Sequence, residues 1–152
     1  MIMKKNIFIL SAIVFLISCN NSGKKIDPLQ VKADSLQNEV LAGHDVAMPN
    51  SMKIPKLQKQ IDQILDSIDK LSPKQQQANA SYKMDLRNLK TGLSNADSLM
   101  QKWMNEFNLD SFNTNLEKRV EYLSSEKDKI NKVKDTVLMS LQKADSLLKK
   151  RS

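Results

Sequence analysis

Residues 82–107 read YKMDLRNLKTGLSNADSLMQKWMNEF and place apolar side chains at alternating spacings of four and three residues. In an α-helix this spacing puts one apolar residue per turn on the same face. The charged residues between them fall on the other faces. The stretch therefore predicts a long amphipathic helix with one stripe to bury against other helices. That stripe consists of Tyr82, Leu86, Leu89, Leu93, Ala96, Met100, Trp103 and Phe107.

The same spacing continues upstream, over residues 28–71, after an Asp27-Pro28 pair typical of an N-cap and first helical residue. Pro49 and Pro55 each remove a backbone donor within this segment. It is therefore either one kinked helix or two helices with a break near 49–55. We expect the kinked helix, because no Gly or loop-like cluster marks a turn. Its stripe consists of Leu29, Ala33, Leu36, Val40, Gly43 or His44, then Leu57, Ile61, Ile64, Ile68 and Leu71.

A second helix is expected to begin at Ser72-Pro73, which repeats the capping signal, and to include residues 82–107. Residues 108–113 read as a connection. The sequence Thr114-Asn115-Leu116-Glu117 then matches a capping box at the start of a third helix. Lys127 and Lys134 interrupt its apolar stripe, and Val133 covers part of the gap. That stripe consists of Leu116, Val120, Leu123, Ile130, Val137, Leu141, Ala144 and Leu148.

The fold class that follows is all-α, as an elongated, coiled-coil-like, up-down-up three-helix bundle over residues 27–152. Its first helix is kinked or broken near Pro49 and Pro55. The 5% aromatic content, 3 Gly and 4 Pro suit helices better than a sheet. Such a rod has a thin core, so pairing with a second copy would be unsurprising.

The first residues of the chain resemble a lipoprotein signal. Lys4 and Lys5 form a positive head, residues 7–17 an apolar run, and Leu16-Ile17-Ser18-Cys19 matches a lipobox. Residues 1–18 are then a signal peptide, and Cys19 becomes the lipidated N-terminus on a tether ending at residue 26. The alternative is an uncleaved signal with a lone thiol. Several acyl chains anchor far more firmly than one.

The localisation expected from this signal is the outer membrane, with the domain facing the periplasm, because Asn20 rather than Asp follows Cys19. Loss of Lys4 and Lys5 lowers the formal charge from +7 to +5. That charge suits an anionic membrane surface or acidic protein partners. The basic residues are spread along the helices, which favours a solvated face. Nucleic acid is not an expected partner in this compartment.

Catalytic motifs are missing from the mature sequence. It holds one His and no free thiol once Cys19 is lipidated, and it shows no nucleophile elbow, phosphate-binding loop or His-Glu zinc motif. Acid pairs such as Asp62 and Asp66 have helical spacing and read as solvated charges. We therefore expect a non-enzymatic protein.

One group of residues does suggest chemistry, a soft-metal ligand set drawn from two short stretches. Folding the helices about a turn near residue 73 sets His44 opposite Trp103 and Met48 opposite Met100. Trp103 is positioned to cap the set by a cation–π contact, and Asp45 to orient the His44 ring. The candidate ligands are His44, Met48, Met52, Met100 and Met104.

An imidazole with two or three thioethers suits Cu(I) or Ag(I), because soft ligands select soft metals. Packing is the competing interpretation, since Met fills irregular gaps in helical cores and contacts aromatic rings favourably. A different ligand or a protein-partner surface is the third. The residues alone leave all three open.

The lipobox, tether and two short motifs together resemble a family of small Bacteroidota lipoproteins often named "viral A-type inclusion protein". The motifs are His44-Asp45-x-x-Met48-Pro49-x-x-Met52 and Met100-x-x-Trp103-Met104-x-x-Phe107. The resemblance supplies no catalytic residues and implies no viral function. It does imply that a common pattern includes His44, Asp45, Met48, Pro49, Met52, Trp103 and Met104.

Overall fold

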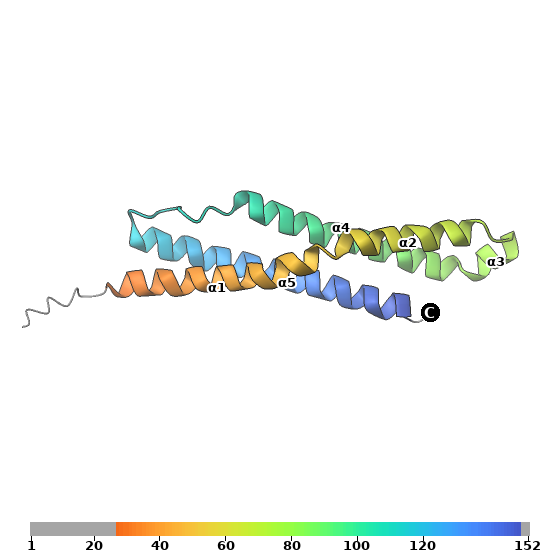
Figure 1. Cartoon of the computed structure of the whole chain (residues 1–152), viewed down its shortest axis with the longest axis horizontal. Helices are drawn as coiled ribbons and strands as arrows, with labels where there is room; N and C mark the ends of the chain where they lie inside the picture. The colour runs from red at the N-terminus through yellow and green to blue at the C-terminus, as the bar shows by residue number, and fades with distance from the viewer. Residues whose placement is uncertain (1–26, 150–152) are drawn as a thin grey trace, which may run out of the picture.

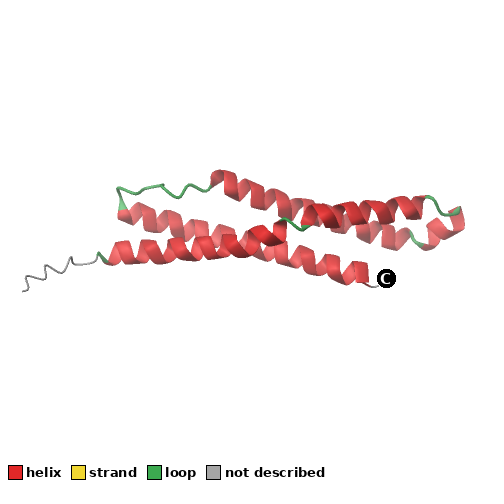
Figure 2. Cartoon of the chain, viewed as in Figure 1, coloured by secondary structure: helices red, strands yellow, loops and turns green. Residues whose placement is uncertain are grey.

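The computed structural model describes residues 27–149, which form helices and short connections without any strand (Figure 2). The all-α fold class is confirmed. The predicted signal, the lipidated Cys19 and the tether lie outside the described residues. The helices are α1 (Pro28–Ser51), α2 (Ile54–Asp69), α3 (Pro73–Ala78), α4 (Ala80–Glu106) and α5 (Leu116–Lys149).

The helices form a long rod (Figure 1). α1 and α2 follow one another along its axis, α3 lies at the far end, and α4 returns beside α2 toward the middle of the rod. α5 lies along α1 and packs against it more extensively than any other pair of helices pack together. α1 and α5 both begin at the same end of the rod, where the connection 107–115 is also found (Figure 1).

Buried positions recur every seven residues in each long helix, which is two turns of helix. One series continues from α1 into α2, two run along α4, and one runs along α5. Side chains seven residues apart share a face, so each series forms one side of the core. The four series are Ala33, Val40, Ala47, Ile54, Ile61 and Ile68; Leu86, Leu93 and Met100; Leu89, Ala96 and Trp103; and Leu123, Ile130, Val137 and Ala144.

A second buried series in α5 contains polar residues, which the apolar stripe expected from the sequence does not include. Its members are Arg119, Glu126, Val133 and Ser140. No fully buried side-chain nitrogen or oxygen among the described residues lacks a hydrogen-bond partner. Polar groups can therefore occupy these core positions without an unsatisfied donor or acceptor.

The expected single kinked helix over residues 28–71 is wrong, because the chain forms two helices separated by Met52 and Lys53. Pro55 cannot donate a backbone hydrogen bond, and its ring conflicts with the carbonyl four residues earlier. Pro49 lies inside α1, whereas Pro55 lies in the first turn of α2. Met52 and Lys53 keep right-handed helical backbone angles, so the interruption is short.

Two other boundaries also differ from the expected ones. The helix expected from Pro73 is divided at Asn79 into α3 and α4. The third helix is capped by Asn115 rather than Thr114, because Asn115 Oδ1 accepts from the Lys118 backbone N–H at 3.0 Å. The first cap is as expected: Asp27 Oδ1 accepts from the Leu29 N–H at 2.8 Å.

Candidate functional site

The only histidine of the chain contacts the only tryptophan. The ring centroids of His44 in α1 and Trp103 in α4 are 5.9 Å apart, with planes inclined at 36°. The expected facing of residues 44 and 103 is therefore confirmed. The contact also brings the helical stretch that carries Met48 beside the stretch that carries Met100 and Met104.

Trp103 is fixed from a third helix. Its Nε1–H donates to Glu126 Oε2 at 3.0 Å, and Lys129 Nζ donates to Glu126 Oε1 at 2.7 Å. Glu126 is only 3% exposed. The hydrogen bond to Glu126 raises the pKa of Lys129 above its ordinary value. A buried carboxylate with two donors holds the indole in one orientation, which sequence spacing alone does not predict.

Trp103 also belongs to a row of aromatic rings. Phe107 stacks on Trp103 with centroids 4.8 Å apart, and Tyr122 follows Phe107 at 6.3 Å with nearly parallel planes. His44 therefore lies at one end of a row of rings that passes from α1 through the end of α4 to α5. Such stacked arrangements add to the burial of apolar surface.

The methionines of the predicted ligand set differ in burial. Met100 is fully buried in the main core, and Met48 and Met104 are partly buried and pack against it. Met52 is 70% exposed at the end of α1 and is not among the side chains packed on that core. Packing alone is a sufficient reason for the position of Met100, since it occupies one of the seven-residue series.

The His44 ring is accessible from solvent, with 31% of its side chain exposed. Its Nδ1 lies 3.1 Å from Asp45 Oδ1, which orients the ring, and Nε2 makes no hydrogen bond with any described residue. This contact is the one predicted for Asp45. Within residues 27–149, no group of three or more His, Cys, Asp or Glu side chains is arranged to hold a metal ion.

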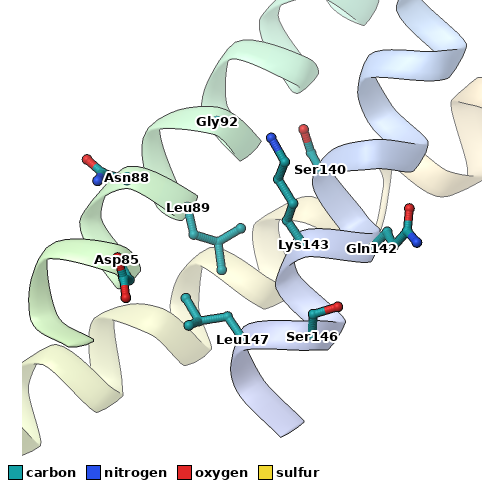
Figure 3. A pocket seen from close by; sticks show the side chains of 9 residues that line it. All are labelled: Asp85, Asn88, Leu89, Gly92, Ser140, Gln142, Lys143, Ser146 and Leu147. Atoms are coloured by element: carbon teal, nitrogen blue, oxygen red, sulfur yellow. The ribbon is translucent and has the colours of Figure 1, made fainter. Parts of the chain in front are cut away.

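Three of the grooves in the described part of the rod lie between long helices. The groove nearest the aromatic row is about 300 Å³ and lies between α4 and α5, with Trp103, Lys102 and Lys129 in its lining. A second, of about 460 Å³, lies between α4 and α5 in the other half of the rod, where Leu89 and Leu147 point toward one another (Figure 3). The largest is about 650 Å³ and separates α5 from α2, with Leu57, Leu138, Leu141 and Leu148 in its lining.

Two charged residues on the buried face of α5, Glu126 and Arg119, were not predicted to be buried; of the two, Glu126 binds Trp103 of the site. Glu126 falls between apolar positions of α5, and Arg119 lies seven residues before it. The seven-residue interval to Val133 and Ser140 is the only signal that assigns both to the buried face. Burial of charged residues is uncommon unless they are paired, so the sequence alone argues against it.

Within residues 27–149, no helix is both long enough and apolar enough to cross a bilayer. Comparisons of the chain with family models, with curated proteins and with solved structures gave no match.

Proposed function

We propose that this protein is a lipid-anchored, non-enzymatic binding module of the bacterial envelope, in which an up-down-up, coiled-coil-like bundle presents one small site. The seven-residue burial series and the packing of α5 along α1 support that architecture. The lipobox ending at Cys19 and Asn20 supports anchoring to the outer membrane on the periplasmic side. The resemblance to small Bacteroidota lipoproteins agrees with this proposal.

The ligand that the site favours is a soft monovalent cation, Cu(I) or Ag(I). The observation that carries this proposal is the contact between His44 and Trp103, because it sets an imidazole beside two methionine-bearing stretches. His44 Nε2 supplies the nitrogen, and Met48 and Met104, which are both partly buried against the main core, supply the thioethers. Met100 would join only if its buried side chain changed rotamer. Met52 would join only if its exposed side chain turned inward.

A competition titration tests the site. The full chain is titrated with Cu(I) in the presence of a chromophoric Cu(I) chelator, and the same titration is run on His44→Ala, Met48→Leu and Met104→Leu chains. We expect the affinity to fall by at least about tenfold in each variant, since each removes one ligand of a set of three.

The matched control replaces exposed methionines that lie outside the site. Met84 and Met139 are both more than half exposed. A Met84→Leu, Met139→Leu chain should bind Cu(I) with unchanged affinity. Equal affinity in the His44→Ala, Met48→Leu and native chains would show that the His/Met cluster is packing and not a metal site.

The anchor has its own test. Native protein recovered from cell membranes should carry acyl chains on the peptide that begins with Cys19, as read by mass spectrometry. A Cys19→Ser chain should lose the acyl chains and leave the membrane fraction. Retention of Cys19→Ser in the membrane to the same extent as the native chain would overturn the anchoring.

A second function, a structural or adaptor protein that holds a partner at the membrane, is favoured by a separate observation. The groove of about 650 Å³ between α2 and α5 exposes leucines to solvent, with Lys53, Lys56 and Lys149 along its rim. This function predicts that a protein co-purifies in fixed proportion with the native chain. A Leu57→Asp, Leu141→Asp chain would then lose that partner, while Cu(I) would leave the melting temperature unchanged.

A further inference from the structure

We propose that the connection 107–115 is a membrane-contacting tip, whose Leu109 and Phe112 side chains enter the lipid surface to which Cys19 anchors the chain. This inference rests on the proposed anchoring. Leu109 and Phe112 are called the Leu109/Phe112 tip below.

The two side chains of the tip are large, apolar and open to solvent. Leu109 is 41% exposed and Phe112 is 48% exposed. Phe112 also has a φ angle of 60°, and it is the only non-glycine residue with a positive φ among the described residues. An aromatic residue rarely adopts this conformation without compensation from its surroundings. The backbone is thus held in a strained conformation at the residue whose aromatic ring is the most exposed between residues 27 and 149.

The connection is held in place by two side chains of α5, Arg119 and Tyr122. Arg119 is buried, and its Nη1 donates to the carbonyl oxygens of Leu109 and Ser111 at 2.9 and 3.0 Å. Tyr122 Oη accepts from the Asn108 backbone N–H at 2.8 Å, and its ring meets that of Phe112 edge-on with centroids 5.8 Å apart. A connection with these contacts presents its apolar side chains in one orientation.

The tip lies at the end of the rod from which the tether leaves. Arg119 Nη2 donates to Gln37 Oε1 at 2.7 Å, which joins the first turns of α5 to the first half of α1. α1 and α5 begin at this same end, together with the connection 107–115 (Figure 1). The chain from Cys19 to Asp27 can span at most about 30 Å when fully extended. An anchored Cys19 therefore keeps this end of the rod close to the lipid.

The chemistry of the connection suits the apolar part of a lipid surface rather than its charge. Residues 107–115 contain one acidic residue, Asp110, and no Lys or Arg. Two partly exposed side chains are too few to recruit a free protein to a bilayer. They suffice to orient a domain whose tether already holds it at high local concentration. The tip therefore sets the angle of the rod to the membrane and, with it, the direction in which the His44 site faces.

Fluorescence quenching in vesicles tests this orientation. A Phe112→Trp chain with its native anchor is reconstituted into phosphatidylcholine vesicles made with or without bromine on the acyl chains. We expect the added tryptophan to lose roughly half of its emission in brominated vesicles, because insertion brings the indole to the acyl boundary. Trp103 is 5% exposed and provides an unquenched background that is measured in the native chain.

Two controls locate the contact. A Met139→Trp chain carries its tryptophan on the later half of α5, where Met139 is 56% exposed, and should show no quenching. A Leu109→Trp chain repeats the measurement at the other residue of the tip, in case Phe112→Trp alters the fold. Absence of quenching at both 109 and 112 in acylated protein, or equal quenching at 139, would overturn the proposal.

The failure of the anchor is distinguishable from the failure of the tip. If mass spectrometry finds no acyl chain, the Cys19 thiol is coupled to a maleimide phospholipid, which supplies the anchor chemically. Quenching at 112 after this coupling supports the tip although the natural anchor is absent. No quenching after the coupling rejects the tip independently of the lipidation.

Discussion

The two halves of the rod bury different kinds of side chain. The half around α2 and the start of α4 is aliphatic, with Ile54, Ile61, Leu86 and Leu93 fully buried. The half around α1 and the start of α5 also buries small residues and charged residues along its seven-residue series. Its buried members include small residues (Ala33, Gly43, Ala47) and charged residues (Arg119, Glu126) beside the larger apolar Leu36, Val40, Trp103, Leu123 and Ile130.

The two halves therefore contribute differently: one mainly to the free energy of unfolding, the other mainly to a unique packing arrangement. Large aliphatic side chains contribute free energy in proportion to the apolar area that they bury, but they specify orientation weakly. Small residues in α1 let α5 approach closely, and a hydrogen-bonded carboxylate such as Glu126 tolerates few other arrangements. The half that carries the candidate site thus tolerates fewer alternative packing arrangements than the aliphatic half. Four predictions test this comparison.

The largest effect is expected from Ile61→Ala in the aliphatic half. The change leaves a cavity at a fully buried position and should lower the free energy of unfolding by about 3 kcal/mol. Chemical denaturation followed by circular dichroism measures it. Ile64→Ala, three residues away and only partly buried, is the control and should have a smaller effect. Equal losses for the two variants would show that burial does not determine stability in this half.

A smaller loss of stability is expected from Glu126→Ala, in the half around α1 and the start of α5. The change leaves the Trp103 Nε1–H without its acceptor and should lower the free energy of unfolding by about 2 kcal/mol. Glu126→Gln keeps a carbonyl acceptor and should lose less. Denaturation curves and tryptophan emission are recorded together, since the indole should become mobile in Glu126→Ala alone. If Gln and Ala behaved alike, the hydrogen bond to Trp103 would have no energetic role.

Two glycines provide a matched pair with effects of opposite sign. A Cβ on Gly92 meets nothing within 4 Å, so Gly92→Ala should raise the free energy of unfolding by about 0.8 kcal/mol through helix propensity. A Cβ on Gly43 would lie 3.0 Å from a methyl group of Ile130, which is itself fully buried. Gly43→Ala should therefore lose about 1 kcal/mol net, because overpacking exceeds the propensity gain. Stabilisation by both would show that α1 and α5 separate easily.

The smallest effect is expected from the ion pair between Glu39 of α1 and Lys127 of α5, whose Oε2 and Nζ atoms are 2.6 Å apart. The hydrogen bond with Lys127 lowers the pKa of Glu39, and the same bond raises the pKa of Lys127. The pair should thus stabilise the fold above the ordinary carboxyl range, and lose this contribution as the pH falls through the lowered pKa of Glu39. At high pH the contribution should disappear as Lys127 deprotonates.

Thermal unfolding of the native and Lys127→Gln chains between neutral and acidic pH measures this dependence. The difference between their melting temperatures should shrink as the pH falls below the ordinary pKa of Glu39. A constant difference would mean that Lys127 acts through packing. Both side chains are accessible to solvent, so the effect is small and screened by salt.

Apolar periodicity was enough to predict that these segments are helical, because most buried positions carry Leu, Ile, Val or Ala, but it did not predict the interruptions at Met52, Lys53 and Asn79. Leu93 and Ile130 could be assigned to the core from spacing alone. Positions such as Glu126 could not, since the partners that allow a charge to be buried come from another helix. Ile54 was missed for a local reason: it lies beside Pro55, in the segment where the break was expected.

The candidate site was partly predictable for the same reason. Folding two antiparallel helices about a turn near residue 73 was enough to predict that His44 faces Trp103, without knowledge of any side-chain contact. The register is not constant, however. Seven positions separate Ser51 from Gln58, whereas three separate their hydrogen-bond partners Asp97 and Ser94. The change in register occurs at the break at Met52 and Lys53. No pattern in the sequence predicts how large this change is.

The seven-residue series passes through that break without a change of phase, from Ala47 to Ile54. The length of this rod is therefore adjustable in fixed steps. Seven residues added to α2, with seven added to α4, would lengthen it by roughly 10 Å and leave every buried face buried. Four residues would instead turn everything beyond them by about 40° and expose the core. A protein of this kind can change its length without altering the part of the rod that carries the candidate site.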